Sequence, residues 1–186
     1  MSRRSDGWLW TYSGKQYWPT DPKVEDVCIE DIAHALSMLC RYTGHVNRFY
    51  SVAEHSVLVS LMVPPELALE GLLHDASEAY LGDVSRPLKR DLPDYKEIEA
   101  FNDAQIRIRF RLPIDEHRLV KQADSDILHT EYRALMRHPL PPNALTQVPG
   151  TWREEVRLFF WPPAQAEIAF LNRYGALMKA SGIRNS

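Results

Sequence analysis

The stretch "EGLLHDASEAYLGD", residues 70–83, places a histidine and an aspartate side by side in an apolar run and follows them with two more carboxylates. Burying an aspartate among apolar neighbours is costly unless the carboxylate is paired or bound to a metal ion. Pro65, just upstream, suits the first turn of a helix, and Gly82 suits a left-handed cap at its end. The sequence therefore predicts one helix over residues 65–81 whose charged groups need a partner.

Outward from this stretch, apolar residues recur three and four positions apart in several more segments, which is the pattern of amphipathic helices. These segments cover about residues 29–40, 51–63, 94–110, 115–138 and 162–182. Ser51 and Asp115 are the expected N-terminal caps of two of them. Residues 8–18 alternate bulky β-formers around a Ser-Gly pair and predict a short hairpin, and residues 138–150 predict a proline-rich excursion over one face of the domain. We therefore expect an all-α bundle with a short N-terminal β-hairpin.

Length, composition and charge narrow the class of protein. With 186 residues the chain has the length of one domain, and 45% hydrophobic with 25% charged residues is typical of a globular protein. A net charge of -3 creates no sequence-wide field for nucleic acid or anionic lipid, so we expect neither partner. Cys28 and Cys40 form no CxxC pair, which suits a reducing compartment and excludes a zinc ribbon. Without an apolar run of membrane-spanning length or a signal peptide, we expect a cytoplasmic protein with no membrane partner.

Four residues of metal-ligand type fall on three of the predicted helices: His55, His74, Asp75 and Asp124. Imidazole and carboxylate suit zinc, manganese, iron or cobalt, whereas calcium prefers more oxygen ligands. A buried, hydrogen-bonded histidine would explain His74 equally well, and Asp124 alone could be a solvated helix residue or an acceptor for Lys121. The coincidence of two histidines and two aspartates at helix-compatible positions favours a metal site.

Three strings resemble the H…HD…D signature of the HD-domain phosphohydrolases: "SVAEH" at 51–55, "LLHDASEAYLGDVSRPLK" at 72–89 and "KQADSDILHTE" at 121–131. The similarity is greatest to two branches that act on deoxynucleotides, the bacterial 5'-deoxynucleotidases and the phage dATP triphosphohydrolases. It covers about residues 29–136. The resemblance implies a single all-helical HD domain over residues 1–186 with its core at about 29–138, located in the host cytoplasm if the protein is phage-encoded.

The same resemblance implies one divalent metal ion on the four ligand-type residues, with cobalt, zinc or manganese expected and magnesium as an alternative. It implies that Arg41 holds phosphate, that Glu78 handles protons and that Asp83 orients the reacting groups. Glu78 follows His74 by four residues and so shares its helix face, although a solvated surface glutamate is the alternative. Asp83 has the alternative of a simple Gly-Asp turn residue.

Basic residues near the predicted pocket mouth supply candidates for binding the substrate. Arg86 and Lys89 lie at the end of the string at 72–89, and Lys121, one turn before Asp124, is a further candidate. Tyr42, next to Arg41, could stack on the sugar or base, but the deoxynucleotidase branch usually has tryptophan there.

These features lead to a functional expectation with alternatives. We expect a metal-dependent phosphohydrolase that converts dATP to deoxyadenosine and triphosphate by metal-hydroxide attack at the α-phosphorus. The first alternative is a 5'-deoxynucleotidase acting on deoxynucleoside monophosphates, and another is a non-catalytic HD nucleotide sensor. Because relatives in this superfamily form dimers or larger rings, we also expect a homo-oligomer.

Overall fold

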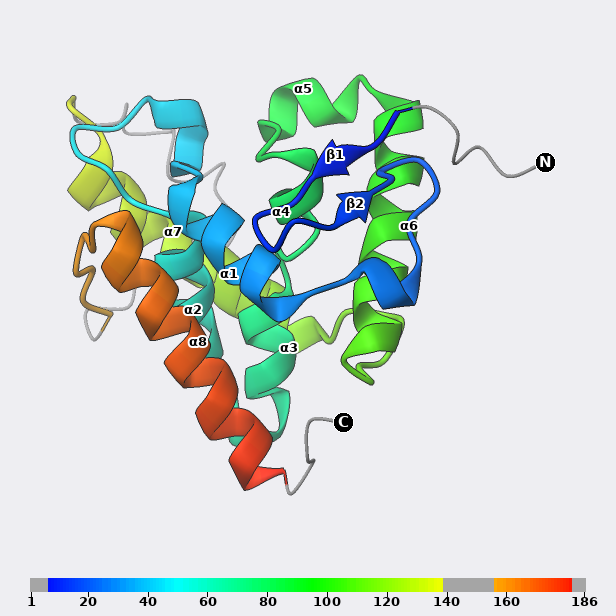
Figure 1. The fold of residues 1–186 in the computed structure, drawn as a ribbon. Coiled ribbons are helices and arrows are strands. Elements are labelled where there is room, and N and C mark those ends of the chain that lie inside the picture. The colour runs from blue at the N-terminus through cyan, green and yellow to red at the C-terminus, as the bar shows by residue number, and fades with distance from the viewer. Residues whose placement is uncertain (1–6, 139–155, 182–186) are drawn as a thin grey trace.

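The computed structural model describes residues 7–138 and 156–181, and these are mostly helical with a two-stranded antiparallel hairpin near the N-terminus (Figure 1). The elements, in chain order, are β1 (Leu9–Trp10), β2 (Gln16–Tyr17), the 3-10 helix η1 (Val24–Asp26), α1 (Ile29–Met38), the 3-10 helix η2 (Arg41–Gly44), α2 (Val52–Met62), the 3-10 helix η3 (Pro65–Leu67), α3 (Ala68–Leu73), α4 (Glu78–Leu81), α5 (Arg86–Arg90), α6 (Pro93–Arg109), α7 (Arg118–Leu135) and α8 (Pro163–Ala180). The expected mostly helical fold with its N-terminal hairpin is confirmed. Among the described residues, none of the helices combines the length and apolar character that crossing a bilayer requires.

Helix α2 lies at the centre of the bundle, in contact with α1, α3, α7 and α8 (Figure 1). Every residue from Val52 to Ser60 is buried, as expected for a helix that is apolar nearly all round. The predicted cap is confirmed, because the Ser51 hydroxyl accepts a hydrogen bond from the backbone N–H of Glu54. The position of α2 explains why His55, on its first turn, has no exposed surface.

The single helix predicted over residues 65–81 is wrong, because the structure divides it into η3, α3 and α4. The interruption covers residues 74–77, where the backbone tightens into turns. There the N–H of Ala76 bonds to the carbonyl of Leu73, and the N–H of Glu78 bonds to the carbonyl of Asp75, both at 3.0 Å. Hydrogen bonds between residues three apart are typical of the 3-10 conformation, which often marks a functional position when it interrupts an α-helix. The His-Asp pair therefore lies on a turn between two short helices.

Helix α3 approaches α2 closely at Gly71. A Cβ atom at this position would lie 3.2 Å from Cα of Ser60, so a larger residue would push the helices apart. The Ser60 hydroxyl also donates a hydrogen bond to the carbonyl of Ala68 at 2.6 Å. This contact sets the distance between the helix that carries His55 and the helix that leads to His74.

Three further boundaries differ from the sequence prediction. Helix α1 ends at Met38 because Cys40 is extended and forms an antiparallel bridge with Ser51. Between the helices predicted to end at 81 and to begin at about 94, the structure has the additional helix α5, with a proline in its first turn. Helix α7 is capped by His117, whose Nδ1 accepts from the N–H of Leu119, and not by Asp115. Most of the predicted proline-rich excursion lies outside the described residues.

The hairpin is tied to α1 by one buried carboxylate. Leu9 pairs with Tyr17 across the two strands, and Gly14 adopts the positive φ that this turn requires. Asp31, only 2% exposed, accepts hydrogen bonds from both the backbone N–H and the hydroxyl of Ser13. The hairpin thus packs as part of the bundle.

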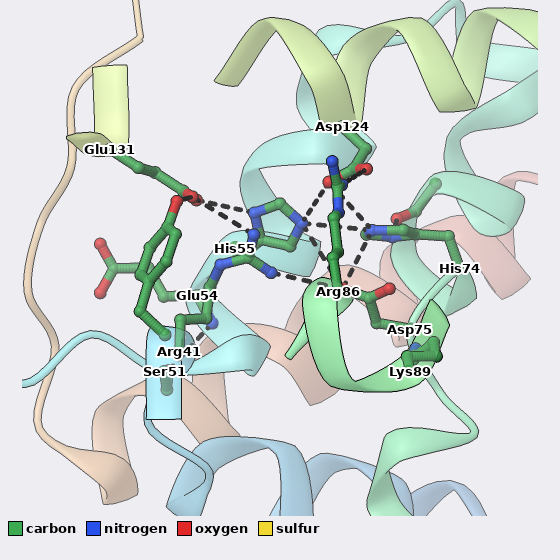
Figure 2. Close-up of polar contacts among 12 residues, drawn as sticks. Arg41, Ser51, Glu54, His55, His74, Asp75, Arg86, Lys89, Asp124 and Glu131 are labelled. Atoms are coloured by element: carbon green, nitrogen blue, oxygen red, sulfur yellow. Dashed lines mark hydrogen bonds and ion pairs between the residues drawn. The ribbon is translucent and has the colours of Figure 1, made fainter. Parts of the chain in front are cut away.

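Glu54 anchors the segment that leads into α8. Its fully buried carboxylate accepts hydrogen bonds from the consecutive backbone N–H groups of Phe159, Phe160 and Trp161, at 2.6 to 2.9 Å. Its carboxylate points away from the cluster formed by His74 and Asp124 (Figure 2). Glu54 is therefore a structural residue beside His55.

A buried ion pair joins α3 to α6. Glu70 and Arg107, each 3% exposed, meet at 3.2 Å, and Glu70 also accepts the N–H of His117 at 2.7 Å. Arg107 donates in turn to the carbonyl of Pro113. This network holds α3, which leads to His74, against the start of α7.

Replacing Arg107 with methionine is expected to lower the free energy of unfolding by about 3–5 kcal/mol, because the buried Glu70 would lose its oppositely charged partner. Urea unfolding followed by circular dichroism measures the change. Arg90→Met is the matched control, since Arg90 is 78% exposed and pairs with an equally exposed Asp91, and it should stay within about 0.5 kcal/mol of the unmodified protein. Equal stabilities for the two variants would contradict the assigned role of the pair.

Candidate metal centre and pocket

His55 presents one ring nitrogen to the centre of the site. Its Nδ1 lies 2.7 Å from the buried carboxylate of Glu131, which can only accept, so Nδ1 donates. Its Nε2 then faces His74 and Asp124 (Figure 2). A carboxylate on the far nitrogen fixes the ring tautomer in this way at many histidine metal ligands.

His74 is oriented by a similar contact with the backbone. Its Nδ1 donates to the carbonyl of Gly71 at 2.9 Å, which leaves Nε2 as the inward-facing nitrogen. The two Nε2 atoms of His55 and His74 are 3.2 Å apart. Because both Nδ1 atoms already serve as donors, two neutral rings would direct their lone pairs at each other. A proton or a metal ion between them relieves that repulsion.

Carboxylates complete the cluster. Oδ1 of Asp124 lies 3.3 Å from Nε2 of His55, and Oδ2 of Asp75 lies 3.2 Å from Nε2 of His74. One ligand atom from each of His55, His74 and Asp124 falls within 4.8 Å of the others. These residues could therefore hold a metal ion, and Asp75 lies beside them.

The electrostatics of the cluster favour a cation. Burial alone would lower the pKa of His74, but the adjacent Asp75 carboxylate raises it to about 10. Burial alone would raise the pKa of Asp124, but His55 and His74 lower it to about 2. The field that keeps positive charge on His74 would equally stabilise a divalent ion.

A pocket of about 650 Å³, a volume typical of small-molecule sites, opens beside this cluster. The predicted site residues that line it are Arg41, Tyr42, Asp75, Glu78, Asp83, Arg86, Lys89 and Asp124. They come from η2, the His-Asp turn, α4, the segment around α5, and α7. The structure thus brings together parts of the chain that are far apart in sequence.

No family model matches the chain. It is 50% identical over 125 residues to the Escherichia coli (strain K12) protein "Uncharacterized protein YfdR". These 125 residues are 67% of this chain and 70% of that relative. The chain belongs to the YfdR family. A second relative, the Rhodobacter capsulatus protein "Uncharacterized protein RCAP_rcc00048", is 37% identical over 116 residues, or 57% of this chain and 59% of the relative. Neither relative's name states an activity.

Glu78 is the least satisfied carboxylate in this YfdR-family pocket. It is 8% exposed, and its Oε2 is buried with no hydrogen-bond partner among the described residues. Burial, followed by the neighbouring charges of Asp75 and Asp83, raises its pKa well above the usual value. Burial also raises the pKa of Asp83. Glu78 therefore tends to keep its proton.

The basic residues in the pocket differ in how far their charge is already paired with carboxylates. Arg41, 9% exposed, lies 3.4 Å from Asp75 and 3.3 Å from Glu131. Lys89 is paired with Glu99 at 2.6 Å. Arg86 is different, because its side chain is 62% exposed while it contacts Oδ2 of Asp124 at 3.0 Å. It is the most exposed of these three cations.

One predicted binding residue lies elsewhere. Lys121 is absent from the pocket lining, its side chain is 63% exposed, and it lies 3.7 Å from Glu116. It belongs to the outer surface of α7.

The structure also adds lining residues that sequence reasoning missed. His45, which the sequence analysis did not select as a site residue, lines the pocket together with Thr43 and Tyr132. Tyr42 and Thr43 adopt left-handed conformations, with φ of 58° and 54°. Only the glycine of "RYTGH" hinted at such a turn, because left-handed backbone is unusual for tyrosine and threonine.

Proposed function

We propose that this chain is an HD-domain phosphohydrolase of deoxynucleotides and that it hydrolyses dATP to deoxyadenosine and triphosphate. The proposal rests on one observation: a possible metal-binding group, His55, His74 and Asp124, adjoins a pocket with a buried acid. Asp124 lines this pocket together with Glu78, whose buried Oε2 has no hydrogen-bond partner among the described residues. The H…HD…D strings support the same chemistry from the sequence.

His55, His74, Asp75 and Asp124 would hold one divalent ion. Two imidazoles with carboxylates favour cobalt, zinc or manganese over magnesium, which prefers oxygen ligands. A bound ion supplies Lewis-acid activation of a water molecule and of a phosphoryl oxygen. The donor set in the structure fits this requirement because both histidines already direct Nε2 inward.

The protein side chains would carry the proton and the substrate. Hydrolysis breaks the bond between the α-phosphorus and the 5'-oxygen, and the departing alkoxide needs a proton. Glu78, protonated and facing the pocket, would donate that proton to the 5'-oxygen. Asp83 would orient the reacting groups, and Arg41 and Arg86 would donate to phosphate oxygens.

Product analysis tests the proposal. Metal-free protein is incubated with each dNTP and dNMP, separately with cobalt, manganese, zinc and magnesium, and the products are resolved by ion-pair chromatography. We expect deoxyadenosine and intact triphosphate from dATP. No hydrolysis of any substrate with any metal would overturn the enzymatic proposal and favour a nucleotide sensor.

A second candidate function is a 5'-deoxynucleotidase, and one observation favours it. Lys89 is already paired with Glu99, and Lys121 does not line the pocket, so fewer free positive charges remain for a triphosphate. In the same experiment, orthophosphate released from monophosphates alone would support this candidate and contradict the first.

A further inference from the structure

Glu131 is a buried carboxylate on α7 that reaches two parts of the site at once. It has no exposed surface, and Arg41 and His55 hold its pKa below the usual value against the opposing effect of burial. Its Oε1 contacts Nδ1 of His55, and its Oε2 lies 3.3 Å from the guanidinium of Arg41 (Figure 2). Oε2 also accepts a hydrogen bond from the hydroxyl of Tyr42. The two oxygens therefore serve different partners: one the metal-ligand histidine, the other the pocket wall.

The pocket wall at this point is a strained turn. Tyr42 and Thr43 are left-handed, and Gly44 follows with a φ of 78°. A non-glycine residue in this conformation costs about 1–2 kcal/mol, so other contacts must hold it in place. The Tyr42 hydroxyl bond to Glu131 and the backbone bond from Arg41 to Tyr50 are such contacts.

We propose that Glu131 is a positioning residue that couples the orientation of His55 to the Arg41–Tyr42 turn, so that metal affinity depends on the Tyr42 hydroxyl. The physical reason is that a carboxylate held at both oxygens cannot rotate. Without the Tyr42 hydroxyl, Oε2 keeps only Arg41 at 3.3 Å and is held less firmly, which loosens Oε1 and the imidazole that it orients. The inference rests on the proposed metal site but not on hydrolysis.

Co²⁺ binding to the full chain tests this coupling, with affinity and the visible absorption of bound Co²⁺ as readouts. Glu131→Gln should weaken binding by about 10–100-fold, as is usual for loss of a group that orients a metal ligand. Tyr42→Phe should weaken it by about two- to tenfold, the range of one hydrogen bond, and should alter the Co²⁺ spectrum. The effects of the two changes should be non-additive in the double variant.

Tyr132→Phe is the matched control. Tyr132 lines the same pocket, its ring lies 5.3 Å from that of Tyr42, and its hydroxyl makes no hydrogen bond to Glu131 in the described part of the chain. It should bind Co²⁺ as the unmodified protein does. Unchanged or tighter binding in Tyr42→Phe would overturn the coupling even if Glu131→Gln fails to fold. Absence of Co²⁺ binding by the unmodified protein would instead reject the metal site on which the proposed function depends.

Discussion

Replacing His74 with alanine is expected to weaken Co²⁺ binding by more than about 100-fold. Loss of a group that merely orients a ligand costs up to about 100-fold, and loss of the ligand itself should exceed that. His74 supplies one of three donor atoms that lie within 4.8 Å of one another, and its inward nitrogen is fixed by Gly71. Without it, only one imidazole remains in the cluster. Competition with a chromogenic chelator gives the dissociation constants.

Two further variants define what this loss means. Asp124→Asn keeps the volume of the side chain while removing its charge, and it should produce a comparable loss. His34→Ala removes a histidine that pairs with Glu167 away from the cluster, and it should leave Co²⁺ affinity unchanged. Circular dichroism before each titration confirms that the variants are folded. If His74→Ala and His34→Ala bound Co²⁺ equally well, the cluster would not be the metal site.

The sequence predicted the cluster because its members combine two readable signals. His55 and His74 are ligand-type residues inside apolar runs, and helix periodicity placed Asp124 in the middle of a third helix. The hairpin was readable for a similar reason, since alternating bulky residues flank a glycine turn. The predictions that the structure supports therefore rest on local sequence pattern and on residue chemistry.

Other features depend on contacts between distant segments and left little local signal. The tightened turn at residues 74–77 has the composition of a continuous helix, so periodicity could not locate the break. The neutralisation of Lys89 depends on Glu99, ten residues along the chain on another helix. The left-handed turn at Tyr42 is held by Glu131, 89 residues away. Such features follow from tertiary structure and not from propensity.

Replacing Glu78 with glutamine is expected to reduce kcat on deoxynucleotides by about 10²–10⁴-fold, the usual contribution of a general acid. Glutamine keeps the size of the side chain but has no proton to give to the 5'-oxygen. The buried position of Glu78 and its raised pKa favour the protonated form more than in an exposed glutamate. Because Glu78 is outside the group that could hold a metal ion, His55, His74 and Asp124, Co²⁺ affinity should change far less than the rate.

The dependence on the leaving group distinguishes a proton donor from a structural residue. A p-nitrophenyl phosphate ester releases a weakly basic phenolate that needs no acid, so Glu78→Gln should lose much less activity on it than on a deoxynucleotide. Glu97→Gln, an exposed change on α6, should match the unmodified protein on both substrates. Equal losses of Glu78→Gln activity on both esters would mean that Glu78 supports the pocket without donating the proton. A selective loss on the alkyl ester follows only if Glu78 protonates the leaving oxygen.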